Sequence, residues 1–112
     1  MGLSTHVLDT SVGRPATGVQ VFLDQRGGDG GWTHVVAAQT DGDGRVGRLV
    51  PAGALAVGVY RLTFAVGDWA AEVGTTTFFP EVSIVFEVTA PDEHHHVPLL
   101  LSPYGYSTYR GS

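Results

Sequence analysis

The sequence contains no cysteine and no lysine among its 112 residues. Without cysteine it can form neither disulfides nor zinc–thiolate sites, and it has no thiol nucleophile. Without lysine, its positive charge rests on six arginines, and the net charge is −5 at pH 7. A nucleic-acid-binding protein needs a basic stripe, and the sequence offers none. Thiol chemistry is therefore excluded, and no nucleic-acid partner is expected.

Long apolar runs are also missing. No stretch approaches the roughly 20 apolar residues that a membrane span needs. Residues 1–10 lack the basic start and apolar run of a secretory signal. We therefore expect a cytoplasmic protein with no membrane partner. Hydrophobic residues still make up 43% of the chain and charged residues only 15%, a balance that can build a core. The length suits a single domain over residues 1–112.

Glycine and proline recur at short intervals, and the segments between them are rich in Val, Leu, Phe, Tyr and Thr. This pattern predicts an all-β sandwich of short strands. The expected strands span residues 3–9, 18–25, 32–40, 44–49, 57–66, 82–89, 94–101 and 104–110. Residues 27–31 are mostly glycine and suit a hairpin loop. One short helix is expected over residues 69–73, with Asp68 as its N-terminal cap and Gly74 as its left-handed stop.

Alternation along a strand predicts which side chains face the core. The segment after His94 contains two alternating series of side chains. We expect the more apolar series to point inward, and it consists of His95, Val97, Leu99 and Leu101. His96 then points outward. In the first strand, Leu3, Thr5 and Val7 share one face, so His6 lies on the opposite one.

Histidine and arginine supply the candidate chemistry. The spacing of His94 and His96 permits a metal site with His6 as a third ligand, and it equally permits acid–base chemistry or a histidine run without a role. Arg45 follows a turn rich in aspartate and glycine, where an isolated arginine is usually solvated. No nucleophile elbow of the G-x-S-x-G type exists, so water activated by histidine is the simplest catalytic hypothesis.

Several segments resemble the transthyretin-related 5-hydroxyisourate hydrolases. The start Leu3-Ser4-Thr5-His6-Val7-Leu8-Asp9 is similar to the start of that family, and so is Gly13-Arg14-Pro15-Ala16. Asp43-Gly44-Arg45 resembles its central arginine turn, and Phe78-Phe79-Pro80-Glu81-Val82 a further block. The segment from His96 to Ser112, which ends in Tyr109-Arg110-Gly111-Ser112, resembles the family's ending almost letter for letter. One departure is His95, where the family usually has tyrosine.

The resemblance implies a transthyretin-like, two-sheet, eight-stranded sandwich with one short helix, assembled as a homotetramer. It implies hydrolysis of 5-hydroxyisourate to 2-oxo-4-hydroxy-4-carboxy-5-ureidoimidazoline in urate degradation. Catalysis would fall to His6, Arg45 and His96, and substrate binding to His6, Arg45, Tyr109 and Ser112. We expect no metal, no cofactor and no covalent intermediate.

The outward positions of His6 and His96 form a flat patch, which a second subunit would have to cover to make a cleft. The expected site therefore lies at a subunit interface. Two other functions stay open from the residues alone. One is a transthyretin-type carrier of small planar ligands, which has no need of the two histidines, the arginine and the Tyr-Arg-Gly-Ser ending. The other is a metal-dependent hydrolase that uses His6, His94 and His96.

Overall fold

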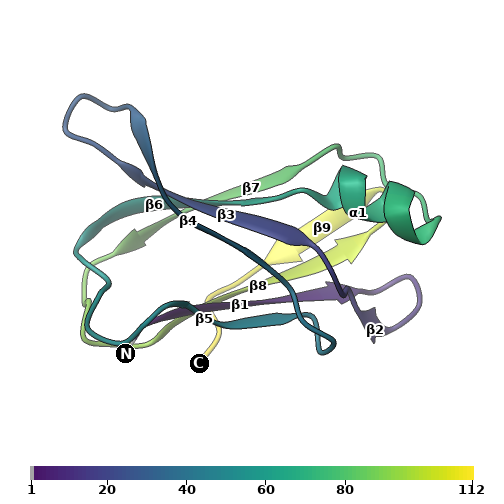
Figure 1. Cartoon of the computed structure of the whole chain (residues 1–112), viewed down its shortest axis with the longest axis horizontal. Coiled ribbons are helices and arrows are strands. Elements are labelled where there is room, and N and C mark those ends of the chain that lie inside the picture. The colour runs from purple at the N-terminus through teal and green to yellow at the C-terminus, as the bar shows by residue number, and fades with distance from the viewer. Residues whose placement is uncertain (1) are drawn as a thin grey trace.

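The computed structural model describes residues 2–112 as two β-sheets packed face to face, with one short helix at one end (Figure 1). In the five-stranded sheet, β1 (Leu3–Asp9) pairs with β2 (Arg14–Pro15), β5 (Arg45–Val50) and β8 (His95–Ser102), and β8 pairs with β9 (Gly105–Thr108). The four-stranded sheet has the order β4 (Trp32–Gln39), β3 (Gln20–Arg26), β6 (Gly58–Phe64) and β7 (Val82–Val88). No helix within residues 2–112 is long and apolar enough to cross a membrane.

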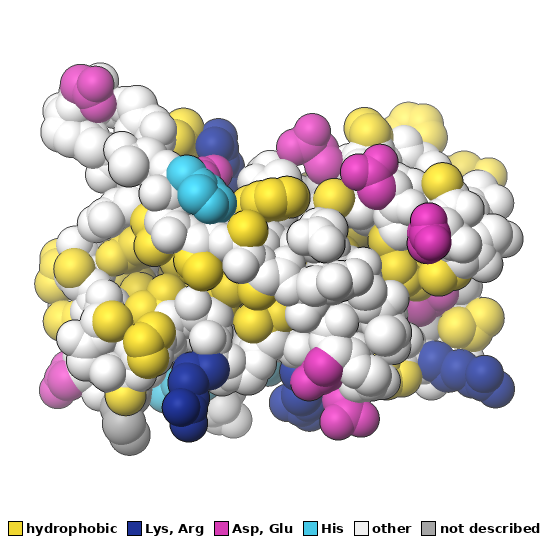
Figure 2. Space-filling view, viewed as in Figure 1, with side chains coloured by type: hydrophobic (Ala, Val, Ile, Leu, Met, Phe, Trp, Pro, Cys, Tyr) yellow, Lys and Arg dark blue, Asp and Glu magenta, His cyan; other side chains and the backbone are white. Residues whose placement is uncertain are grey.

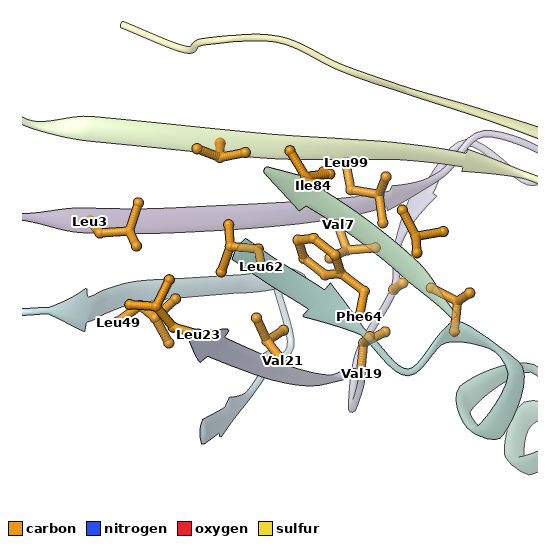
Figure 3. Close-up of a cluster of buried hydrophobic side chains, with 14 of the residues drawn as sticks. Leu3, Val7, Val19, Val21, Leu23, Leu49, Leu62, Phe64, Ile84 and Leu99 are labelled. Atoms are coloured by element: carbon orange, nitrogen blue, oxygen red, sulfur yellow. The ribbon is translucent and has the colours of Figure 1, made fainter. Parts of the chain in front are cut away.

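The hydrophobic core fills the space between the two sheets. Both sheets direct alternate apolar side chains inward, and Figure 3 shows these side chains meeting between the strands. The fully buried residues include Leu3, Val7 and Leu99 from one sheet and Leu23, Leu62 and Phe64 from the other. Because side chains occupy the interior, a site for a small molecule has to lie on an outer face or an edge.

The predicted two-sheet sandwich with one short helix is confirmed. Each of the eight expected strands is present, with ends that differ from the prediction by no more than about two residues. The two-residue strand β2 is additional. The predicted faces of β8 are also confirmed, because His95, Val97, Leu99 and Leu101 are buried whereas His96 is only partly so.

The predicted start of the helix is wrong. Helix α1 spans Val66–Val73, and its N-cap is Ala65, which makes no side-chain capping hydrogen bond. Asp68 lies in the first turn, where its charge suits the helix dipole but caps nothing. The helix begins earlier because Val66, Trp69 and Ala70 form a buried stripe that packs against the core. The predicted stop is confirmed: Gly74 has φ 74°.

A tight turn between β4 and β5 brings Arg45 to the start of β5. Gly44 in this turn has φ 74°, and its carbonyl accepts a hydrogen bond from the Val7 amide at 2.7 Å. A Cβ atom at Gly44 would lie 2.5 Å from the Val7 carbonyl oxygen and 2.9 Å from Cβ of Pro15. Only glycine fits here, and the fit fixes the turn against β1.

We predict that Gly44→Ala lowers the free energy of unfolding by more than the ~1–2 kcal/mol cost of a left-handed alanine, because the steric clash adds to it. Urea denaturation would measure the change. Gly42→Ala is the matched control, since Gly42 belongs to the same turn, has no positive φ and has open space around its Cβ position. Equal stability of the two variants would contradict the argument.

Candidate functional site

The strand register places four residues of interest on the outward face of the five-stranded sheet. His6 of β1 lies opposite Arg45 of β5, and Ser4 of β1 lies beside His96 of β8. Ser4, His6 and His96 alternate with buried residues, so all three point away from the core. Figure 2 shows arginine side chains gathered along the lower side of the molecule, where Figure 1 shows this sheet. Segments about 90 residues apart in the chain therefore meet on one surface.

An open depression of about 270 Å³ lies on this surface. It is lined by Ser4, Thr5, Arg45, Gly47, His94, His96 and Ser112. Most of these side chains are polar. Arg45 comes from β5, whereas His96 lies on β8 and His94 immediately before it. Such a surface can bind a small polar molecule and exchange protons with it.

His6 is held in a defined orientation beside this depression. Its Nε2 lies 2.9 Å from the carbonyl oxygen of Asp43 in the arginine turn. A carbonyl oxygen can only accept a hydrogen bond, so Nε2 must carry the proton and donate it. In the neutral ring, Nδ1 is then the nitrogen with a free lone pair. The contact also ties β1 to the turn that carries Arg45.

His96 is partly buried, whereas Arg45 is exposed. Its Nδ1 is 2.7 Å from the hydroxyl oxygen of Ser4. Burial lowers the pKa of His96 below its ordinary value of 6.5, and the positive charges of Arg45, His6 and His94 lower it further. His96 is therefore neutral at pH 7 and able to accept a proton. Its Nε2 makes no hydrogen bond to another residue in the described part of the chain.

Asp41 shapes the turn that presents Arg45. One carboxylate oxygen of Asp41 accepts hydrogen bonds from the backbone amides of Asp43, at 2.9 Å, and Arg45, at 3.0 Å. These two bonds lower the pKa of Asp41 below its usual value of 3.8, and the bond from the Arg45 amide has the larger effect. The carboxylate stays charged at neutral pH and keeps the turn closed. The Arg45 guanidinium forms no salt bridge within residues 2–112, so its donors remain available to a ligand.

The C-terminal segment packs directly on His96. The amide of Gly111 donates to the His96 carbonyl oxygen at 2.8 Å, and the two residues form a β-bridge. A Cβ atom at Gly111 would lie 2.4 Å from Cδ2 of the His96 ring, so glycine is what allows this approach. The next residue, Ser112, consequently reaches the depression.

The structure brings Arg45, His96 and Ser112 together in the depression, with His6 next to Arg45 but outside its lining, whereas Tyr109 lies elsewhere. Tyr109 is 59% exposed and lines a separate, largely apolar pocket of about 310 Å³ at the open edge between β7 and β8. His95 lines that pocket as well, is 5% exposed, and its Nδ1 donates to the Glu93 carbonyl oxygen at 2.9 Å. A histidine thus fits this inward position because the backbone offers it a partner.

The histidines do not assemble a metal centre. In the part of the chain that the structure describes, no group of three His, Asp or Glu side chains is arranged to hold a metal ion. His94 instead directs its Nε2 to the Ser4 hydroxyl, at 2.8 Å. The ligand set that a metal-dependent hydrolase would need from His6, His94 and His96 is therefore not formed.

Sequence reasoning missed Ser4 as a site residue. Alternation does predict that Ser4 shares the face of His6, and this was the available signal. What it cannot predict is that β1 and β8 run parallel with Ser4 beside His96. That register makes Ser4 the hydrogen-bond partner of both His94 and His96.

Comparison with known proteins identifies the family of this chain. Residues 3–111 match the model of the HIUase/Transthyretin family. The 5-hydroxyisourate hydrolase of Caulobacter vibrioides is 52% identical over 116 residues, covering 99% of this chain and 98% of that protein. The 5-hydroxyisourate hydrolase of Salmonella dublin is 50% identical over 110 residues, covering 98% of this chain and 80% of that protein.

Two solved structures are similar over almost the whole fold. The 5-hydroxyisourate hydrolase of Klebsiella pneumoniae has a TM-score of 0.84 at 39% identity, covering 98% of this chain and 92% of that one. Sea bream transthyretin in complex with thyroxine has a TM-score of 0.91 at 32% identity, covering 99% of this chain and 95% of that one. The transthyretin-like fold and the resemblance seen in the sequence are thereby confirmed, and the chain belongs to the HIUase/Transthyretin family.

Proposed function

We propose that this protein is an enzyme that hydrolyses 5-hydroxyisourate to 2-oxo-4-hydroxy-4-carboxy-5-ureidoimidazoline, a step of urate degradation. One observation carries the proposal: a neutral His96 and an unpaired Arg45 face the same small depression. A proton acceptor beside a guanidinium is what water attack on a cyclic amide requires. The relatives that are half identical to the chain bear the name of this hydrolase.

In this proposal His96 is the general base. Its Nε2 takes a proton from a water molecule while the water oxygen bonds to the carbonyl carbon of the six-membered ring. The ring C–N bond then breaks, and the proton passes from the imidazolium to the departing ring nitrogen. The products are an open ureido group and a carboxylic acid, which loses its proton to solvent and becomes a carboxylate. Because water attacks the substrate directly, this mechanism has no covalent enzyme intermediate, and it calls on no metal or cofactor.

Arg45 binds the substrate's carbonyl oxygens and stabilises the negative charge that develops during attack. His6, held by the Asp43 carbonyl, directs its free Nδ1 to a donor on the substrate or the water. Ser112 contributes a hydroxyl at the edge of the depression. Tyr109 was expected to help position the substrate, and it does not line this depression in a single copy. We therefore propose that Tyr109 helps to position the substrate only when several copies of the chain assemble.

The depression is open, and one copy of the chain leaves its substrate exposed to bulk water. We propose a homotetramer in which a second copy covers this face and encloses the site. Enclosure would strengthen the electrostatic contacts of Arg45 and limit side reactions with solvent. We also propose that the protein acts in the cytoplasm, an environment that suits its cysteine-free sequence.

A carrier function is the second candidate, since sea bream transthyretin shares the fold and was solved with thyroxine. Two observations disfavour it here. The depression is small and polar, whereas a carrier site for a large aromatic ligand needs apolar walls. In addition, His96 and Arg45 face the same depression, and a histidine beside a guanidinium suits proton transfer better than passive binding of an apolar ligand.

The direct test adds the purified protein to freshly prepared 5-hydroxyisourate and follows the loss of its ultraviolet absorbance above the spontaneous rate. We predict that His96→Ala lowers kcat/KM by about 10²–10⁴-fold, the usual contribution of a general base. His6→Ala should also lose most activity. His34→Ala is the control, because His34 is exposed on the other sheet. No acceleration by the wild-type protein would refute the proposed function.

We predict that Arg45→Lys is nearly as damaging to kcat/KM as Arg45→Ala. A guanidinium holds two acceptors at once in a fixed plane, and an ammonium group cannot. Arg14→Lys, at an exposed position on β2, should behave as wild type. Normal turnover of the Arg45→Lys variant would reduce Arg45 to a diffuse positive charge.

The pH profile of kcat/KM should fall on the acid side with a midpoint below pH 6.5. The sign follows from His96: protonation removes its ability to act as a base, and its pKa lies below the ordinary 6.5. The same shift costs stability in acid, because the unfolded chain binds the proton more tightly below pH 6.5. Circular dichroism at each pH would separate the two effects. A midpoint above pH 6.5 in folded protein would exclude His96 as the titrating base.

A further inference from the structure

The Ser4 hydroxyl lies between two histidine rings. Its oxygen is 2.7 Å from Nδ1 of His96 and 2.8 Å from Nε2 of His94, and the residue is 7% exposed to solvent. No other group in residues 2–112 hydrogen-bonds to this hydroxyl. The next hydroxyl on the strand serves another purpose, because Thr5 points inward and donates to the Val97 carbonyl oxygen at 2.6 Å.

The hydroxyl has one proton, so it can donate to only one of the two rings. In the first arrangement, Nδ1–H of His96 donates to Ser4, and Ser4 donates to Nε2 of His94. In the second, Nε2–H of His94 donates to Ser4, and Ser4 donates to Nδ1 of His96. Each arrangement satisfies all three atoms. If both rings donated, the buried hydroxyl proton would have no acceptor, and that is unfavourable.

The two arrangements have opposite consequences for the chemistry. The first leaves Nε2 of His96 with a lone pair, ready to take a proton from water. The second puts the proton on Nε2 and leaves His96 unable to act as a base there. We propose that Ser4 and His94 are positioning residues that set which ring nitrogen of His96 carries the proton. The effect of this proton position on catalysis rests on the proposed function, whereas the position itself does not.

His94 is exposed whereas Ser4 is buried, so the Ser4 hydroxyl joins a solvent-exposed ring to the partly buried ring of His96. Arg45 and Ser112 line the same depression as the two rings, and Arg48 lies next to His94.

The test measures the tautomer directly. Long-range ¹H–¹⁵N NMR on the folded, ¹⁵N-labelled protein distinguishes protonated from unprotonated ring nitrogens. In the wild type at pH 8 we expect hydrogen on Nδ1 and a lone pair on Nε2 of His96. Ser4→Ala should shift population to the Nε2–H tautomer and lower kcat by about tenfold with little change in KM. Ser4→Thr, which keeps the hydroxyl, should restore both readouts.

His94→Ala is a second, independent variant at an exposed position, where loss of the side chain costs little stability. Without His94 as acceptor, Ser4 donates to His96, so the same tautomer shift and loss of kcat are expected. Ser83→Ala on the opposite sheet is the control and should change neither readout. Hydrogen on Nε2 in the wild type, or an unchanged tautomer in both Ser4→Ala and His94→Ala, would overturn the inference.

The two proposals fail separately. If the wild type does not accelerate loss of 5-hydroxyisourate, the proposed function is refuted, and the NMR result still decides the role of Ser4 and His94. If the tautomer responds as expected but kcat does not, His96 is not the base, and the relay has no catalytic role.

Discussion

The parallel pairing of β1 with β8 is the constraint on which the rest of the structure depends. The pairing runs without a break from Leu3 beside His95 to Asp9 beside Leu101. One face of this ladder buries Leu3, Val7 and Leu99 in the core. Because side chains alternate, the opposite face then carries the intervening residues, which include Ser4, His6 and His96. Core packing and site geometry are consequences of one register, and a slip of one residue would exchange them.

Much of the fold follows from local pattern. Turn residues and alternation predicted the eight longer strands and the faces of β8, because both signals depend on neighbours a few residues away. The start of the helix was not predicted correctly from the local capping signal. Asp68 has the chemistry of a cap, yet burial of Val66, Trp69 and Ala70 moved the start of the helix ahead of it. The gain from a buried stripe outweighs the ~1 kcal/mol that a cap contributes.

The site was predictable in part. His6, Arg45 and His96 stood out by resemblance, and alternation placed both histidines outward. The contact between Ser4 and His96 was not predictable, because it joins residues 92 positions apart and depends on strand direction as well as register. Tyr109 stays a prediction, because in a single copy it does not line the depression. It belongs to the same short motif as Ser112, but the chain turns between them, and the tyrosine lies at another edge of the sandwich.

Fold similarity alone cannot assign the activity. Sea bream transthyretin superimposes with a TM-score of 0.91, while the hydrolase of Klebsiella pneumoniae reaches 0.84. The backbone is therefore compatible with a thyroxine-binding protein and with a hydrolase, and the activity has to be argued from the outward side chains of β1, β5 and β8. Those side chains can change without cost to the core, because the residues between them provide the packing. A sandwich of this kind can thus gain or lose a catalytic site on the outer face of a sheet, while the inner face continues to provide the core packing that stabilises the fold.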